Sequence, residues 1–300
     1  MHIGLLGELQ VLDDDEKDVE VTGAKLRALL VVLALRPGRA VPVDQLVDAL
    51  WGPESSAAAR NGLQGLVSKL RRALGSASLV ATRGGGYALE VPPEAVDLHR
   101  FEQLVAAGRA MAISGNLESA IELLADADSL WRGEALTEFA YEEFAAAEVS
   151  RLSELRLAAV EERLDIELQL GRHRGVIVEL ESLVAAHALR ERLRGLLMIA
   201  LYRSGRQADA LRTFQEGRRI LGEELGLDPG PELRQLEAAI LAQDPSLDVS
   251  TPDRRDTEVW TERRSTVPES LTPLVGRDTE VRDLAQLFGD HRFITLVASS

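Results

Sequence analysis

The chain has 300 residues, enough for about two domains, and its 45% hydrophobic and 28% charged residues are typical of folded globular proteins. The absence of cysteine excludes a disulfide scaffold, a thiol nucleophile and a cysteine zinc site, and no apolar run approaches the ~18 residues of a membrane helix. A formal charge of −15 would argue against nucleic-acid binding if it were evenly spread along the chain.

The first residues predict short strands. Residues 3–12 form an apolar run with partial alternation, residues 13–18 form a charged turn, and residues 19–21 alternate again. The start of the chain lacks the basic segment and the apolar core of a signal peptide. We therefore expect a cytoplasmic protein.

Two helices are predicted next. Apolar residues at helical spacing indicate a helix over residues 23–36, with Thr22 as its N-cap and a Pro-Gly pair at its end. A second helix over residues 43–50 has Asp44 at its positive end, and a Trp-Gly-Pro sequence follows it.

The third predicted helix, residues 57–74, has two contrasting faces. Its apolar face consists of Ala59, Leu63, Leu66, Val67, Leu70 and Leu74. The opposite face contains no acid and consists of Asn61, Gly65, Ser68 and Arg72, flanked by Gln64, Lys69 and Arg71.

Two short strands over residues 79–82 and 87–89 follow, joined by a glycine-rich turn that leaves Arg83 at its tip. Three helices followed by such a hairpin predict a winged helix-turn-helix, in which the third helix enters the major groove of DNA. An arginine on the wing suits the narrow, electronegative minor groove. The alternative is a small helical domain whose polar face meets only water.

The charge is unevenly distributed. Residues 1–96 have a net charge of −2, and residues 97–245 have a net charge of −10. Within the first of these regions, residues 55–89 contain no acid and have a net charge of +5. The basic residues of this island are Arg60, Lys69, Arg71, Arg72 and Arg83. Such an island favours binding to a phosphate backbone, although chance clustering on a solvated helix would give the same count.

Residues 97–241 predict a succession of amphipathic helices with an internal repeat. The sequence SGNLESAI at 114–121 is similar to SGRQADAL at 204–211. Gly171 and Gly205 are 34 residues apart, the period of tetratricopeptide repeats, whereas Gly115 and Gly171 are 56 apart, which indicates an insertion containing Trp131 and residues 134–143. Stacked repeats provide a concave protein-binding surface; a bundle that only holds a dimer together is the alternative.

Three segments carry a resemblance to a known family. DQLVDALW at 44–51, LVSKLRRALG at 66–75 and TRGGGY at 82–87 resemble the OmpR-type winged helix of the actinobacterial antibiotic regulatory proteins, the AfsR-like family. The resemblance implies that the third helix faces bases and phosphates and that the wing reaches the minor groove. The candidate DNA-binding residues are Trp51, Arg60, Asn61, Gln64, Ser68, Lys69, Arg71, Arg72, Thr82, Arg83 and Tyr87.

This sequence departs from the family in having Gly62 and Gly65 inside the third helix, each costing about 1 kcal/mol relative to alanine. Gly65 would either let the helix backbone approach DNA closely or make the helix so soft that it becomes ordered only on binding DNA.

A second resemblance concerns the helical region. ALRTF at 210–214 and LGEELGLDPGPEL at 221–233 resemble the bacterial transcriptional activation domain of the same family. The resemblance implies an activator that binds direct repeats in double-stranded promoter DNA near the −35 element, possible homodimers on those repeats, and contacts with the sigma factor and alpha subunit of RNA polymerase. It also implies control of a secondary-metabolite (antibiotic) pathway.

Residues 244–270 are polar and predict a flexible linker, and residues 271–300 resemble the beginning of the nucleotide-binding module of larger family members. The Gly-x4-Gly-Lys-Ser/Thr motif of such modules is absent, so this is either a fragment of a longer protein or a chain with a vestigial tail. We favour the fragment, and we expect the chain as given not to bind ATP. The five histidines show no metal-ligand spacing and no nucleophile motif occurs, so we expect neither an enzyme nor a cofactor.

The predicted fold is therefore mainly α: a winged helix-turn-helix with a small sheet and a wing over residues 1–96, then an all-α, tetratricopeptide-like domain over residues 97–243. The predicted function is DNA-binding activation of transcription. Two alternatives are the regulatory part of a signalling ATPase and an interaction scaffold with a degenerate winged helix.

Overall fold

The computed structural model describes residues 1–52 and 57–248. Residues 1–250 form one compact unit, which contains all of these residues. The second unit, residues 251–300, lies outside the described residues, as do most of the predicted linker and the whole segment that resembles a nucleotide-binding module.

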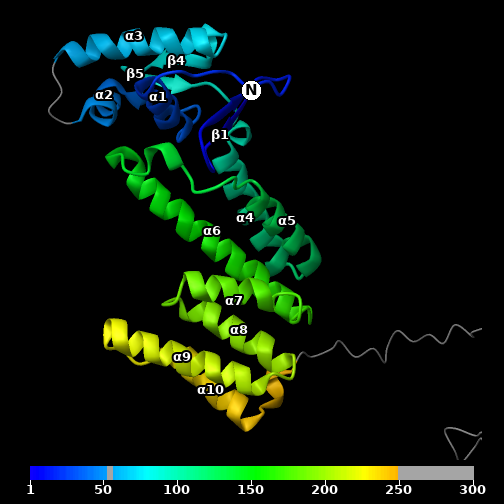
Figure 1. Cartoon of the computed structure of the whole chain (residues 1–300). Coiled ribbons are helices and arrows are strands. Elements are labelled where there is room, and N and C mark those ends of the chain that lie inside the picture. Colours follow the sequence, from blue (N-terminus) through cyan, green and yellow to red (C-terminus); the bar gives the residue numbers. More distant parts are fainter. Residues whose placement is uncertain (53–56, 249–300) are drawn as a thin grey trace, which may run out of the picture. The chain divides into compact units, whose positions relative to one another are not determined.

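The N-terminal region contains two small sheets and three helices (Figure 1). Its elements are β1 (His2–Gly4), β2 (Gln10–Leu12), α1 (Ala24–Ala34), β3 (Val41–Pro42), α2 (Val43–Trp51), α3 (Ala57–Ala73), β4 (Val80–Arg83) and β5 (Gly86–Leu89). Strands β1 and β2 pair antiparallel, and the second sheet has the order β3-β5-β4. This order of helices and wing strands confirms the predicted winged helix.

Two predictions for this region are wrong. Thr22 does not cap α1, because the N-cap position is Gly23, whose φ of 99° favours glycine. Residues 19–21 form no strand: the amide of Val19 donates to the carbonyl oxygen of Val11, and the segment then leads directly into α1. Strand β3 was not predicted, because two residues show no periodicity.

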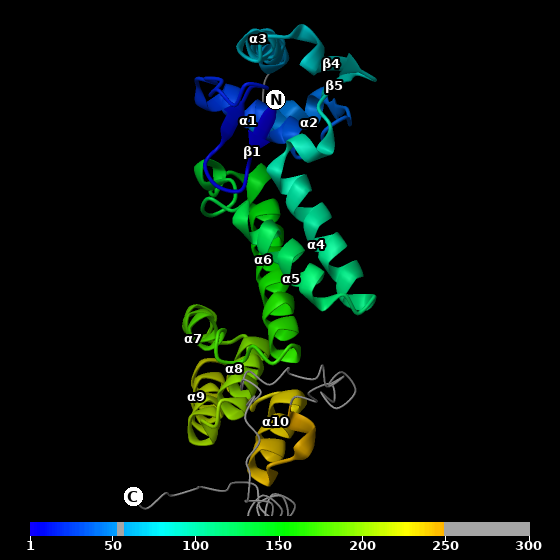
Figure 2. The same ribbon diagram turned by 90° about the vertical axis from the view of Figure 1, so that its right-hand side faces the viewer.

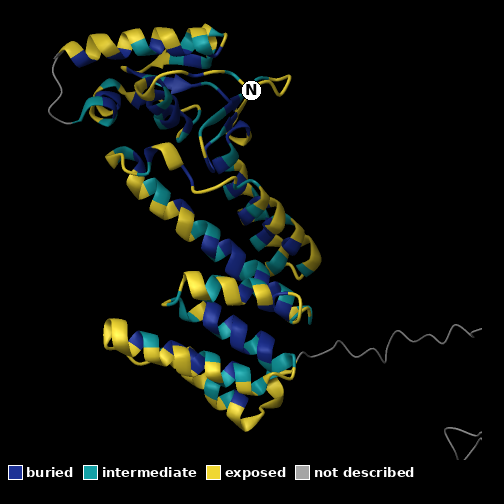
Figure 3. Cartoon of the chain, viewed as in Figure 1, coloured by how far each residue is buried: buried dark blue, intermediate teal, exposed yellow. Residues whose placement is uncertain are grey.

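Helix α3 packs as its periodicity predicts. Five of the six apolar residues are buried, and Leu66 is half-buried: Ala59, Leu63, Val67, Leu70 and Leu74 form the buried set. The polar residues of the opposite face are exposed, which is visible as the outer side of α3 in Figure 3.

The rest of the described chain is helical (Figure 2). Its helices are α4 (Asp97–Ile113), α5 (Leu117–Ser129), α6 (Glu143–Gln169), α7 (Ile177–Ala186), α8 (Glu191–Arg203), α9 (Gln207–Leu225) and α10 (Pro231–Ala242). Gly115, Gly171 and Gly205 each lie just after a helix, with φ between 75° and 82°, so the internal repeat marks equivalent turns after α4, α6 and α8. The insertion forms the connection from α5 to α6, with a 3₁₀ turn at Thr137–Phe139.

Two hydrophobic cores hold the unit together. The first extends from Leu5 and Leu33 in the N-terminal region to Phe101 on α4 and Leu152 on α6. The second lies around α7 to α10 and also includes residues of α6, among them Leu164. Helix α6 thus belongs to both cores, and the first core continues from the winged helix into the helical region.

Within residues 1–52 and 57–248, no helix combines the length and the apolar character needed to cross a bilayer.

Candidate nucleic-acid interface

The exposed face of α3 offers the groups that the sequence predicts for DNA binding. Asn61, Gln64, Ser68, Lys69 and Arg72 are all exposed. The hydroxyl of Ser68 donates to the carbonyl oxygen of Gln64 at 3.0 Å, which leaves its oxygen free to accept. The face presents two amide side chains, a hydroxyl and two cations on one helix, a set able to bond base edges and phosphates.

The cations of α3 differ in their partners. Among the described residues, neither Lys69 nor Arg72 takes part in an ion pair. Arg60, by contrast, contacts Asp44 of α2 through a 2.7 Å Nη2–Oδ1 bond. Residues 55–89 contain no acid, yet in the folded protein Asp44 neutralises one of their arginines. The positive charge of the exposed α3 face therefore comes from Lys69 and Arg72.

Arg71 points toward the wing. Its Nε and Nη2 donate to the carbonyl oxygen of Val80 at 2.8 and 2.6 Å, and Nη2 also donates to the hydroxyl of Thr82 at 3.1 Å. Both predicted DNA contacts, Arg71 and Thr82, therefore bind each other. The arrangement ties the C-terminal part of α3 to strand β4.

The wing has Arg83 near its tip, as the sequence predicts. The Arg83 side chain is 58% exposed, and its Nε lies 3.0 Å from a carboxylate oxygen of Glu90. Gly84 and Gly85 have φ of 53° and 79°, which a reversal this tight requires. An added Cβ at Gly86 would overlap the carbonyl oxygen of Val41, so this glycine permits β5 to pair with β3.

Trp51 and Tyr87 are both half-buried. The Trp51 ring packs against Gly62 of α3, where an added Cβ would lie 3.1 Å from Cζ2, and the ammonium of Lys25 lies 4.5 Å from the ring centroid. Tyr87 is in β5, opposite Thr82 in β4. An alanine at position 62 would therefore crowd the Trp51 ring, whereas Gly65 has open space around it.

Sequence reasoning missed the partners of these side chains. Asp44, Glu90 and Val80 bind Arg60, Arg83 and Arg71, respectively, from other elements of the fold. No local pattern marks such pairs. The segment 55–89 contains no acid, but this does not show which acids from other elements lie beside it in the fold. Asp44 and Glu90 are two such acids.

Comparison with known proteins shows the same two-part arrangement. Residues 16–89 match the family described as "Transcriptional regulatory protein, C terminal", and residues 96–241 match the "Bacterial transcriptional activator domain". The regulatory protein DnrI of Streptomyces peucetius is 38% identical over 263 residues, which cover 84% of this chain and 96% of DnrI.

Longer relatives match as well. The regulatory protein AfsR of Streptomyces coelicolor is 40% identical over 289 residues, which are 96% of this chain and 29% of AfsR. The chain thus spans less than a third of AfsR, and 26% of the AfsR of Streptomyces griseus. These relatives are named as regulators, and none as an enzyme.

A solved structure, that of Mycobacterium tuberculosis EmbR in complex with a low affinity phosphopeptide, is similar with a TM-score of 0.78 and 36% identity. The match covers 81% of this chain and 65% of that one. With the winged helix, the helical region and these relatives in agreement, the chain belongs to the AfsR-like family of antibiotic regulatory proteins, which combine an OmpR-type winged helix with a bacterial transcriptional activator domain.

Proposed function

We propose that this chain is a sequence-specific DNA-binding activator of transcription. The observation that carries the proposal is the exposed polar face of α3, with Lys69 and Arg72 uncompensated, beside a wing with Arg83 near its tip. A helix with such a face fits the major groove, and cations that neutralise phosphates release counterions and so supply affinity.

Within this proposal the exposed residues divide into two roles. Asn61 and Gln64 have amide side chains of the kind that pair with the edge of adenine. Lys69 and Arg72 contact phosphates or guanine, and Arg83 enters the adjacent minor groove after exchanging Glu90 for DNA. Ser68 supplies a further hydroxyl.

The helical region is proposed to contact protein. Residues 97–245 have a net charge of −10, so the DNA backbone repels them and they stay available to a protein partner. The family to which they belong supports RNA polymerase, through its sigma factor and alpha subunit, as that partner, with two protomers on direct repeats near the −35 element. The resemblance to the antibiotic regulatory proteins supports control of an antibiotic pathway, in the cytoplasm where the chromosome lies.

The test is a mobility-shift titration with a promoter fragment at several salt concentrations. We expect Lys69→Ala and Arg72→Ala each to weaken binding about tenfold. Each is also expected to reduce the slope of log K against log salt by about 1, because one phosphate contact is lost.

Arg219→Ala is the matched control, since Arg219 lies on α9 and pairs only with acids of its own helix. Binding that is absent, insensitive to salt, or equal in all variants would contradict the proposal and favour an interaction scaffold with a degenerate winged helix.

The activation part has a separate test. In transcription with purified RNA polymerase, the wild-type chain is expected to raise transcript yield from a promoter carrying the direct repeats. Tight binding without any rise in yield would leave DNA binding in place and refute activation.

A second candidate, the regulatory part of a signalling ATPase, is supported by the AfsR proteins, of which this chain spans less than a third. Reading the gene beyond Ser300 tests it: a Gly-x4-Gly-Lys-Ser/Thr motif would favour the ATPase, and a stop codon would exclude it.

A further inference from the structure

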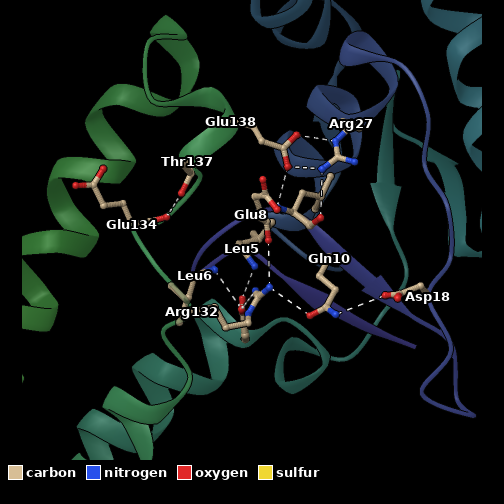
Figure 4. A network of polar contacts seen from close by, with 12 residues as sticks. Leu5, Leu6, Glu8, Gln10, Asp18, Arg27, Arg132, Glu134, Thr137 and Glu138 are labelled. Carbon is tan, nitrogen blue, oxygen red and sulfur yellow. Dashed lines mark hydrogen bonds and ion pairs between the residues drawn. The ribbon is translucent and has the colours of Figure 1, made fainter.

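The N-terminal hairpin β1–β2 and the loop between its strands make several hydrogen bonds to the helical region. Figure 4 shows the side chains of Arg132 and Glu138, both from beyond residue 96, beside this loop. The segment also lies before residue 16, where the match to the winged-helix family begins. Its function therefore needs a separate explanation.

Arg132, in the connection between α5 and α6, is the centre of the contact. Its Nη1 donates to the carbonyl oxygen of Glu8 and to Oε1 of Gln10, both at 3.2 Å. Its Nη2 contacts Oδ2 of Asp97 at 2.9 Å, and its backbone amide donates to the carbonyl oxygen of Leu6 at 2.8 Å. One residue thus binds the loop, β2 and the start of α4.

Asp97, the first residue of α4, completes the arrangement. Its two carboxylate oxygens accept from the backbone amides of Leu5, at 2.7 Å, and Leu6, at 3.1 Å. A carboxylate at a helix N-terminus is also favoured by the helix dipole. The loop after β1 is consequently held to both α4 and the α5–α6 connection.

The hairpin is shaped around this arginine. An added Cβ at Gly4 would overlap the Arg132 guanidinium, and one at Gly7 would lie 3.1 Å from the Arg132 Cβ. Gly4 has an ordinary φ, so an alanine there would leave the backbone unstrained and would displace the guanidinium.

A second ion pair lies beside the first. Arg27 of α1 binds Glu138 through Nε–Oε2 at 2.7 Å, and the amide of Leu9 donates to Glu138 at 3.0 Å. The amide of Leu136 donates to the carbonyl oxygen of Leu5 at 2.9 Å. Each of these bonds joins the winged helix to the segment between α5 and α6.

We propose that these contacts form an interdomain joint, comprising Asp97, Arg132, Glu138 and their N-terminal partners, which fixes the orientation of the helical region relative to α3. Arg132 is a positioning residue: it holds the activator surface at a set place relative to the promoter without touching DNA. The inference rests on the proposed function, because a fixed orientation matters only if both regions act on the same promoter complex.

The alternative is that the joint only adds stability. A stabilising contact would change unfolding and DNA binding together, whereas a positioning contact changes activation while DNA affinity stays. Two variants disrupt the joint in different ways. Arg132→Ala removes the guanidinium that donates to Glu8, Gln10 and Asp97, whereas Gly4→Ala keeps Arg132 and displaces its guanidinium. Arg219→Ala serves as the control, since its partners lie on its own helix.

The experiment combines three measurements on the full chain. Spin labels at Thr22→Cys and Ala125→Cys, both exposed and unique because the chain has no cysteine, report the distance between the two regions by pulsed electron resonance. DNA affinity comes from a mobility-shift titration, and activation from transcription with purified polymerase.

For Arg132→Ala and Gly4→Ala we expect a broadened distance distribution and DNA affinity within about twofold of wild type. We also expect transcript yield to be at least about fivefold lower, while Arg219→Ala matches wild type in all three measurements.

An unchanged distance distribution would overturn the joint, and activation that falls only in proportion to DNA affinity would overturn positioning. If the wild-type chain itself does not activate, the proposed function fails, and the distance measurement alone decides whether the joint exists.

Discussion

The guanidinium of Arg71 on α3 donates twice to the carbonyl oxygen of Val80 on β4, through Nε at 2.8 Å and Nη2 at 2.6 Å. A residue that the sequence assigns to DNA therefore links the predicted recognition helix to the wing. A lysine at this position would keep the positive charge, but it could not make the paired donation from Nε and Nη2 to the Val80 carbonyl oxygen, because only arginine has two parallel donors.

We predict that Arg71→Ala and Arg71→Lys both weaken DNA binding about tenfold, since each frees the wing from α3. The slope of log K against log salt should stay at the wild-type value in Arg71→Lys, measured by fluorescence anisotropy. Arg72→Lys is the control and should bind nearly as wild type. If Arg71→Lys binds as wild type, Arg71 acts as a simple cation toward phosphate.

The two glycines of α3 allow a paired test. Gly65→Ala should raise the free energy of unfolding by about 0.5–1 kcal/mol, because alanine favours a helix and nothing obstructs its Cβ. Gly62→Ala gains the same propensity but places Cβ 3.1 Å from the Trp51 ring, so its gain should be smaller or reversed.

Urea unfolding of both variants gives the comparison directly. Equal stabilisation by the two substitutions would show that Trp51 moves away without cost. DNA affinity measured on Gly65→Ala then reports separately whether this position needs close approach to the duplex.

The second core contains a buried arginine with neutral partners. Arg194 is 3% exposed, and its guanidinium donates to the carbonyl oxygens of Thr213 and Ala188, both at 3.0 Å. Burial lowers the pKa of Arg194 below its ordinary value. Gly217 lies against its stem, where an added Cβ would overlap it.

We predict that Arg194→Ala costs about 2–4 kcal/mol, because it leaves a cavity and removes the donor that two carbonyl groups share. Gly217→Ala should also destabilise, by forcing the arginine out of place. Arg192→Ala is the control, since this half-exposed neighbour makes only long ion pairs of 3.8 Å. Calorimetry should separate the three, and an Arg194→Ala melting temperature equal to that of the control would contradict the prediction.

The contact between α4 and α6 predicts a pH dependence. A hydrogen bond with His99, and then one with Arg151, lower the pKa of Glu102 below its ordinary 4.5. A carboxyl whose pKa is depressed by folding contributes stability above pH 4.5, and this contribution disappears as pH falls through the native pKa.

Glu102→Gln should therefore be less stable than wild type above pH 5, with the difference shrinking as the pH falls toward 3, in urea unfolding at several pH values. Glu118→Gln, at an exposed position, controls for the loss of one negative charge. A difference between Glu102→Gln and wild type that is independent of pH would refute this linkage.

Local patterns account for most of the fold that could be predicted. The apolar spacing on α3 and the glycines between β4 and β5 act within a few residues, so their elements were located to within one or two positions. The glycine turns after α4, α6 and α8 were recognisable for the same reason, since each needs a positive φ.

The rest depended on partners distant in sequence. Arg132 and Glu8 are 124 residues apart, and Leu5 and Asp97 are 92 apart, so no periodicity links them. Arg71 illustrates the limit at the candidate site: its charge and its place on the helix were evident from the sequence, but its direction depended on where β4 lies. The assignment of individual residues to bases or phosphates stays a prediction.

The hydrophobic core that continues from the winged helix into α6 bears on how such proteins diversify. A recombination that exchanged the winged helix alone would separate Leu5 from Phe101 and the hairpin glycines from Arg132. An exchange that preserves these contacts has to include the N-terminal half of the protein through α6 as one piece. We therefore expect a chimaera that exchanges residues 1–96 alone to be less stable than one that exchanges the chain through α6.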